Sequence, residues 1–288
     1  GAGQGQGIDQ SGRAGKEPVR ATVSPDGRTI ALPSIVRRYA SREDNVRLYT
    51  VMTAHEAGHL EFGTYKLSLG PLGDVVGALR QRYGREDAQE VQSLAQVFAL
   101  YPQPGLARDL WTVLEDARVE YRLQQEYPGL KHELALLARE AVTTRSLLHG
   151  LSVRELVVDA LLLLSTAEPG TVQIPDSIRD LVERLWALSQ VVLTPSAAAE
   201  DVVRLVDRLY VAMDEALAST VRQETNQEES AQEVDQGAGP KASEETAGQY
   251  RSVTNWAYRG VMNPDMVRDR NEAGDEAGGS GDAGSAAQ

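Results

Sequence analysis

The stretch from Ser41 to Tyr65 reads SREDNVRLYTVMTAHEAGHLEFGTY and decides how the rest of the chain is interpreted. Apolar residues recur at helical spacing from Val46 to Phe62, and a serine followed by acidic residues is typical of a helix start. The stretch therefore predicts one long helix. Because small or apolar residues surround its two histidines, we expect this helix to be buried.

The same helix carries the pattern H-E-x-x-H at His55, Glu56 and His59. Residues four apart lie on one face of a helix, so both imidazoles can bind one cation. Zinc lowers the pKa of a bound water to about 7, and a neighbouring carboxylate can take the proton. The pattern predicts a Zn²⁺ site with Glu56 as general base. The alternative is a surface helix with two solvated histidines.

A catalytic zinc takes three protein ligands, so the site needs one more. The segment Trp111–Leu123, WTVLEDARVEYRL, places several acids on an otherwise apolar helix. We predict Glu115 as the third ligand, because Arg118 can orient its carboxylate. Asp116 can instead accept a hydrogen bond from the ring N–H of a ligating imidazole, and Glu120 is a further alternative ligand. In the structural alternative, Glu115 only pairs with Arg118.

Two further histidines, His132 and His149, are weaker candidates for the third ligand. Each lies near the end of a predicted helix among charged or polar residues, where solvent-facing or capping roles are the simpler interpretation. The chain has no cysteine, which excludes thiolate zinc sites, cysteine nucleophiles and disulfides. Any metal must therefore be held by His, Asp or Glu.

The charge and hydropathy of the chain argue against two classes of partner. With 42 acidic and 29 basic residues, the formal net charge is −13. Phosphate backbones are bound by clustered Lys and Arg, so we expect no nucleic-acid partner. No apolar run approaches the roughly 18 residues that a membrane span needs, and the first residues do not resemble a signal peptide. We expect a cytoplasmic protein without a membrane partner.

Composition divides the chain into a helical middle and looser segments. The absence of an initial Met and the Gly- and Ala-rich end suggest a fragment of a longer protein. Polar, acidic or Gly-rich stretches cannot bury enough apolar surface to fold, whereas the aromatic residues after position 249 have something to bury. We expect a flexible linker at 1–17, a helical domain at 18–220, an acidic disordered linker at 221–248, a short ordered segment at 249–267 and a disordered tail at 268–288.

The predicted fold class is mostly α (α+β), with a small hairpin before the metal helix. Ala21–Leu32 holds two β-rich runs around a Pro-Asp-Gly turn. We expect this hairpin to lie against the metal helix and to offer an edge to an extended substrate. Further helices are predicted at Asp74–Tyr83, Glu86–Leu100, Leu106–Tyr127, His132–Leu148, Val153–Leu164, Ser177–Leu193 and Ser196–Ala218.

Blocks 33–65 and 101–130, with YRSVTNWAYRGVMNPDM at Tyr250–Met266, carry a family resemblance. They resemble the region upstream of the von Willebrand A domain in NorD/CbbO-type proteins, the nitric oxide reductase and rubisco activation proteins. The resemblance covers roughly residues 19–267. It implies a MoxR-class AAA+ ATPase partner and a non-proteolytic adaptor or activator role, in which zinc is structural.

The metal motif also resembles that of gluzincin metallopeptidases, in which a downstream Glu completes H-E-x-x-H. This resemblance implies a zincin-like helical domain that hydrolyses a peptide or protein substrate. It implies His55 and His59 as ligands, Glu56 as general base and Glu115 as the distal ligand. The sequence departs from the family at Val119, where gluzincins often have Asp. Of the two functions, the intact motif favours the zinc-dependent metallopeptidase, and the adaptor is the alternative.

Overall fold

The computed structural model describes residues 21–24, 29–145, 150–167, 170–232, 250–254, 256 and 258–268. It is mostly helical with one two-stranded antiparallel sheet, which confirms the predicted fold class. The linker expected at 1–17 and the tail from residue 269 lie outside the described residues, as do 233–248 of the expected acidic linker.

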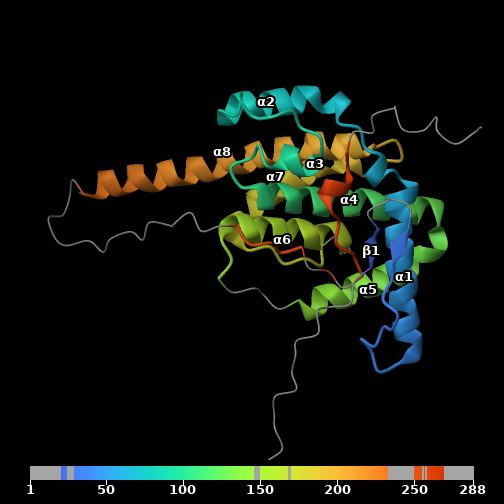
Figure 1. The fold of residues 1–288 in the computed structure, drawn as a ribbon. Coiled ribbons are helices and arrows are strands. Elements are labelled where there is room, and N and C mark those ends of the chain that lie inside the picture. Colours follow the sequence, from blue (N-terminus) through green and yellow to red (C-terminus); the bar gives the residue numbers. More distant parts are fainter. Residues whose placement is uncertain are drawn as a thin grey trace, which may run out of the picture.

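Helix α4 lies at the centre of the fold and packs against three other long helices (Figure 1). Its neighbours α6 and α8 run beside it, whereas α1 crosses near one end. The long helices are α1 (Arg42–Glu61), α4 (Pro104–Glu126), α6 (Val153–Thr166) and α8 (Ala199–Gln232). The others are α2 (Gly73–Tyr83), α3 (Leu94–Phe98), α5 (Lys131–Thr144) and α7 (Arg179–Ser189).

Helix α1 begins and ends where its sequence predicts. The Ser41 side chain accepts a hydrogen bond from the Asp44 backbone N–H at 3.3 Å, which satisfies one unpaired donor of the first turn. The helix ends before Gly63, whose φ of 83° lies in the left-handed region that favours glycine. The 3-10 turn η1 (Thr64–Lys66) then folds back beside the last turn of α1.

Helix α4 is buried around its whole circumference in its middle. Pro104 occupies the first turn, where its missing N–H costs nothing. Every residue from Val113 to Glu120 is buried, the four charged ones included. Buried charges are costly unless they are paired, so the partners of these side chains decide what this region does.

The predicted helix at Glu86–Leu100 is wrong, because only α3 forms there. Residues 86–93 are mostly polar, and only Ala88 and Val91 pack partly against the core. Ser93 caps α3 by accepting from the Gln96 backbone N–H. Helix α8 instead runs longer than predicted, to Gln232 rather than Ala218. The chain has no Gly or Pro between Pro195 and Gly237, so nothing in that stretch stops a helix rich in Glu and Gln.

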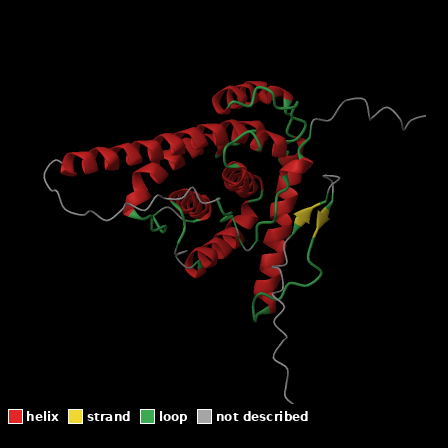
Figure 2. Cartoon of the chain, turned by 60° about the vertical axis from the view of Figure 1, so that its left-hand side comes forward, coloured by secondary structure: helices red, strands yellow, loops and turns green. Residues whose placement is uncertain are grey.

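The predicted hairpin is present as strands β1 (Thr22–Val23) and β2 (Ile30–Ala31), paired antiparallel with Thr22 opposite Ala31. Its turn, residues 25–28, lies outside the described residues. Strand β2 packs against α1, and Figure 2 shows the two strands beside that helix. The hairpin therefore lies on the helix that carries the H-E-x-x-H pattern.

The segment after residue 249 returns to the body of the fold. Its aromatic residues Trp256 and Tyr258 are buried, as expected, and Met262 joins the same core. It ends in a bridge between Ser93 and Arg268. Among the described residues, no helix has the length and apolar character that crossing a membrane requires.

Candidate metal centre

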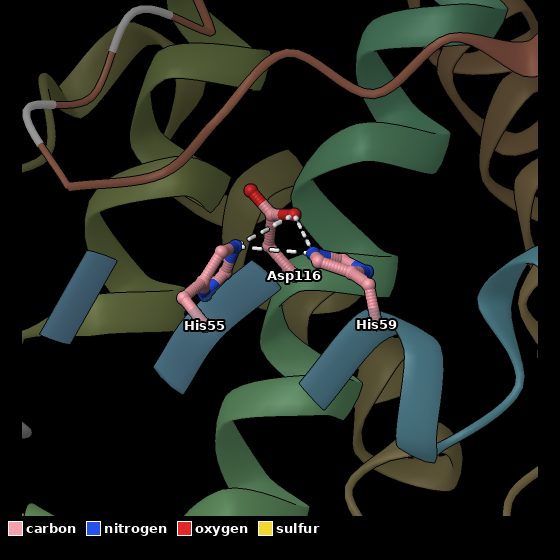
Figure 3. Close-up of side chains that lie close together, drawn as sticks. All are labelled: His55, His59 and Asp116. Carbon is pink, nitrogen blue, oxygen red and sulfur yellow. Dashed lines mark hydrogen bonds and ion pairs between the residues drawn. The ribbon is translucent and has the colours of Figure 1, made fainter. Parts of the chain in front are cut away.

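Helices α1 and α4 bring two imidazoles and one carboxylate together where they cross (Figure 3). His55 Nε2 lies 3.1 Å from His59 Nε2, and Asp116 Oδ1 lies 3.5 Å from the first and 3.3 Å from the second. Within the described part of the chain, this is the one group of His, Asp and Glu with ligand atoms close enough to share an ion. All three side chains are buried.

The three distances fit a tetrahedral zinc. Ligand atoms about 2.0–2.1 Å from such an ion lie roughly 3.3–3.4 Å from one another. The observed distances of 3.1, 3.3 and 3.5 Å scatter around that value. Two His and one carboxylate are also a ligand set that zinc uses in catalytic sites, where the fourth position stays open.

The hydrogen bonds of His59 show which of its ring nitrogens is the donor. The Thr64 hydroxyl donates its only proton to Glu115 Oε1 at 2.5 Å, because a carboxylate can only accept. The same hydroxyl oxygen lies 2.9 Å from His59 Nδ1, so Nδ1 must be the donor there. Nε2 is thus the ring nitrogen left to bind a metal, and it faces Asp116 and His55.

His55 is backed by a second carboxylate. Its Nδ1 lies 3.3 Å from Glu120 Oε1, although the angle is outside good hydrogen-bond geometry. Burial opposes protonation of His55, but Asp116 and Glu120 outweigh it and raise its pKa to about 10. Burial also opposes the charged form of Asp116, but Arg259 and the two imidazoles hold the pKa of Asp116 well below its usual range.

Glu115, predicted as the third ligand, lies behind the metal group instead of in it. Arg118 donates to both of its oxygens, at 2.6 and 2.9 Å, and Thr64 donates to one of them. Both Glu115 and Arg118 are fully buried. The prediction for Glu115 is therefore corrected: the structural alternative describes its pairing, and Asp116 takes the place beside the imidazoles.

Arg118 holds this end of the site rigid. Besides Glu115, it donates to the backbone carbonyl oxygens of Phe62 and Ala197, at 3.0 and 3.2 Å. Its guanidinium thus ties α4 to the end of α1 and to the start of α8. A series of hydrogen bonds runs from Arg118 through Glu115 and Thr64 to His59. It orients the His59 imidazole from outside the metal group.

We expect Arg118→Leu to lower the free energy of unfolding by about 3–5 kcal/mol, because it leaves the Glu115 carboxylate buried without its partner. Urea unfolding followed by circular dichroism measures the change. The matched control is Arg179→Leu, which breaks a pair with Asp176 at the same i,i+3 spacing on the surface. That control is expected to cost about 0–1 kcal/mol. Equal losses in the two variants would contradict the role given to Arg118.

Glu56 does not belong to the group of ligand atoms formed by His55, His59 and Asp116. It is buried, and its Oε1 accepts a hydrogen bond from the Gly260 backbone N–H at 3.0 Å. One oxygen of its carboxylate is thus held by the segment that follows residue 249. Tyr65 lies beside it, and burial together with the charges of Glu56 and Asp116 raises the pKa of the Tyr65 phenol.

Arg259 is a site residue that the sequence did not predict. It donates to both oxygens of Glu120, at 2.8 and 3.0 Å, and lies 3.6 Å from Asp116 Oδ2. Tyr258 beside it packs its ring edge-on against His55, with 6.2 Å between ring centres. No local pattern could have revealed these contacts, because Arg259 lies far along the chain from both acids.

The buried charges of the site leave an excess of negative charge. Glu56, Asp116 and Glu120 each carry one negative charge, and Arg259 supplies one positive charge. The raised pKa of His55 lets a proton offset one of these charges when no metal is bound. Metal binding requires both imidazoles neutral, and two negative charges then remain, apart from the Glu115–Arg118 pair, which balances itself. A divalent cation cancels that excess, and uncompensated buried charge is costly. The residues therefore fit a bound Zn²⁺.

The other two histidines take no part in the described site. His132 is exposed on α5, and His149 lies outside the described residues. Comparison of the chain with protein-family models, with curated proteins and with solved structures gives no match. The chemistry of the site residues is therefore the guide to function.

Proposed function

We propose that this chain is a zinc-dependent metallopeptidase domain with His55, His59 and Asp116 as the metal ligands. The observation that carries the proposal is the set of three buried ligand atoms 3.1–3.5 Å apart, two of them from the H-E-x-x-H pattern. When bound, Zn²⁺ supplies a Lewis acid that polarises a carbonyl and makes water acidic. Asp116 replaces Glu115 in the ligand set first predicted.

Glu56 is the proposed general base. Peptide hydrolysis adds water across the C–N bond: the oxygen joins the carbonyl carbon, and the leaving nitrogen takes a proton. Glu56 accepts that proton from the attacking water and passes it to the nitrogen. Its position one residue after His55 puts it next to the metal group without making it a ligand.

The hairpin supports a peptide as the substrate. Strand β1 begins beside the site, since the Ala21 carbonyl oxygen lies next to Gly260, which itself contacts Glu56. Main-chain pairing with the edge of a short sheet is a general way to hold an extended peptide. We propose that β1 and the residue before it guide the substrate backbone past Glu56.

A second function is favoured by the closure of the site. His55, Glu56, His59 and Asp116 are all at most 3% exposed, and Glu56 already holds a hydrogen bond. If the site stays closed, the role of the metal is to pin α1 to α4. The domain is then a non-proteolytic adaptor, and its resemblance to NorD/CbbO-type proteins suggests a MoxR-class AAA+ ATPase as partner. That partner and the cytoplasmic location stay predictions.

The experiment that tests the metal site is zinc content by mass spectrometry on the purified chain, combined with hydrolysis of a peptide library. One zinc per chain with hydrolysis supports the peptidase. One zinc without hydrolysis under any condition favours the adaptor. A chain that binds no zinc after incubation with a stoichiometric amount overturns both functions.

A further inference from the structure

The described residues of 250–268, here called the strap, cross the metal centre from one firm attachment to another. At the first, Asp109 on α4 accepts hydrogen bonds from the Tyr250 hydroxyl, the Ser252 hydroxyl and the Val253 backbone N–H, at 2.8, 2.9 and 3.0 Å. At the second, the Leu94 N–H donates to the Val267 carbonyl at 3.0 Å. In Figure 3 the strap is the reddish tube above the three labelled side chains.

Between these attachments, the strap contacts the groups that a peptidase needs free. The Arg259 guanidinium fills a pocket made by Glu120 and Asp116 and is 2% exposed. Two parallel N–H donors meet the two oxygens of Glu120, which is the fork geometry that only an arginine offers.

The strap backbone at Gly260 is in direct contact with Glu56. Its N–H donates to Glu56, and a Cβ built there would overlap Glu56 Oε1 and lie 2.5 Å from the Ala21 carbonyl oxygen. Because Gly260 has no side chain, the strap fits at this position between the proposed general base and the start of the hairpin. A substrate peptide has to occupy the same space to reach Glu56.

A pocket of about 330 Å³ adjoins the strap at this point. It is lined on one side by Gly260, Val261 and Met262 and on the other by the first turns of α4, including Arg108 and Thr112. The groove that holds the strap is thus not filled along its whole length. A peptide bound in place of the strap has room there for a side chain after the residue that matches Gly260.

We propose that the strap is an internal pseudosubstrate, and that the site takes extended peptides with an arginine where the strap has Arg259. This inference rests on the proposed peptidase function and adds its substrate class and its regulation. The strap backbone at Gly260 occupies the space in front of Glu56, which keeps a substrate peptide from reaching the base. Displacement of the strap opens the groove, and Glu120 then selects the arginine of the incoming peptide.

The test uses the zinc-loaded chain and fluorescent peptides that carry a central Arg, Lys or Gln in one otherwise constant sequence. Binding is measured by anisotropy and cleavage by mass spectrometry. Gly260→Ala displaces the strap by overlap, and Gly77→Ala is the matched control, because a Cβ on Gly77 meets nothing within 4 Å. A tethered segment competes at an effective concentration near millimolar, so Gly260→Ala is expected to bind the Arg peptide at least about tenfold more tightly than wild type.

Two further measurements identify the pocket. In Gly260→Ala, a synthetic peptide of residues 250–268 is expected to compete with the Arg peptide, and the same peptide with Arg259→Gln is expected to compete at least about tenfold less well. Adding Glu120→Gln is expected to remove the preference for Arg over Gln. Equal binding of the three test peptides in Gly260→Ala would overturn the proposal.

The outcomes separate this inference from the function on which it rests. Strap-dependent binding of the Arg peptide without cleavage keeps the strap as the occupant of an arginine-binding groove and removes the peptidase. Cleavage that ignores both Arg and the strap keeps the peptidase and overturns the inference. If Gly260→Ala no longer binds zinc or melts without cooperativity, the strap is part of the core and cannot be displaced, which also overturns it.

Discussion

Asp116→Ala is expected to empty the metal centre, from about one zinc per chain in the wild type to less than roughly a tenth. Loss of a partner behind a ligand already costs about 10–100-fold in metal affinity, and loss of a ligand costs more. The measurement is zinc content after gel filtration in the presence of a weak chelator. His59→Ala should behave in the same way, because its Nε2 belongs to the same group.

Glu115→Gln is the control that separates the two neighbouring acids. A glutamine still accepts from Thr64 or Arg118, so the orientation of His59 is largely kept. We expect stoichiometric zinc at saturation, with an affinity lower by about 10–100-fold. Zinc lost from Glu115→Gln and retained by Asp116→Ala would return the third ligand to Glu115. A thermal melt of each variant shows whether the fold survives.

The metal helix could be predicted from the sequence because its signals are local. The Ser41 cap, the acids of the first turn and the spacing of His55 and His59 all lie within one helix. The geometry of a helix then places both imidazoles on one face. Nothing from the rest of the fold is needed for that step.

The third ligand could not be predicted because α4 has no polar face in its middle. Glu115 and Asp116 are neighbours, so the rotation of α4 about its axis decides which of them faces α1. An amphipathic helix reveals that rotation through its apolar stripe, but every residue from Val113 to Glu120 is buried. The like charges of Asp116 and Glu120, four residues apart, were the available signal for a nearby cation.

The contacts of Arg259 and the place where the strap packs could not be predicted, for a different reason. The contact between Arg259 and Glu120 joins residues 139 positions apart, and no periodicity carries information over that distance. The aromatic residues around Arg259 did predict that the segment packs onto the body of the fold. Where it packs depends on Asp109 and Glu120, both buried acids on α4 that need donors from elsewhere.

Glu56→Gln is expected to keep zinc and to lower peptide hydrolysis by a factor of about 10²–10⁴ or more, which is the usual contribution of a general base. Glutamine has the shape of glutamate but cannot accept the proton from water. Zinc content and the initial rate of cleavage are measured on the same preparations. The comparison is made both in the wild-type chain and in Gly260→Ala, in which the groove is open.

The substitution separates chemistry from folding because the structural role of Glu56 survives it. The amide oxygen of a glutamine can still accept the Gly260 N–H, so the free energy of unfolding should change by no more than about 1 kcal/mol. A rate loss without a stability loss therefore assigns the base. If Glu56→Gln cleaves peptides as fast as its parent, Glu56 is not the base. If neither chain cleaves any peptide while both hold zinc, Glu56 only receives the strap, and the metal only pins α1 to α4, as the adaptor requires.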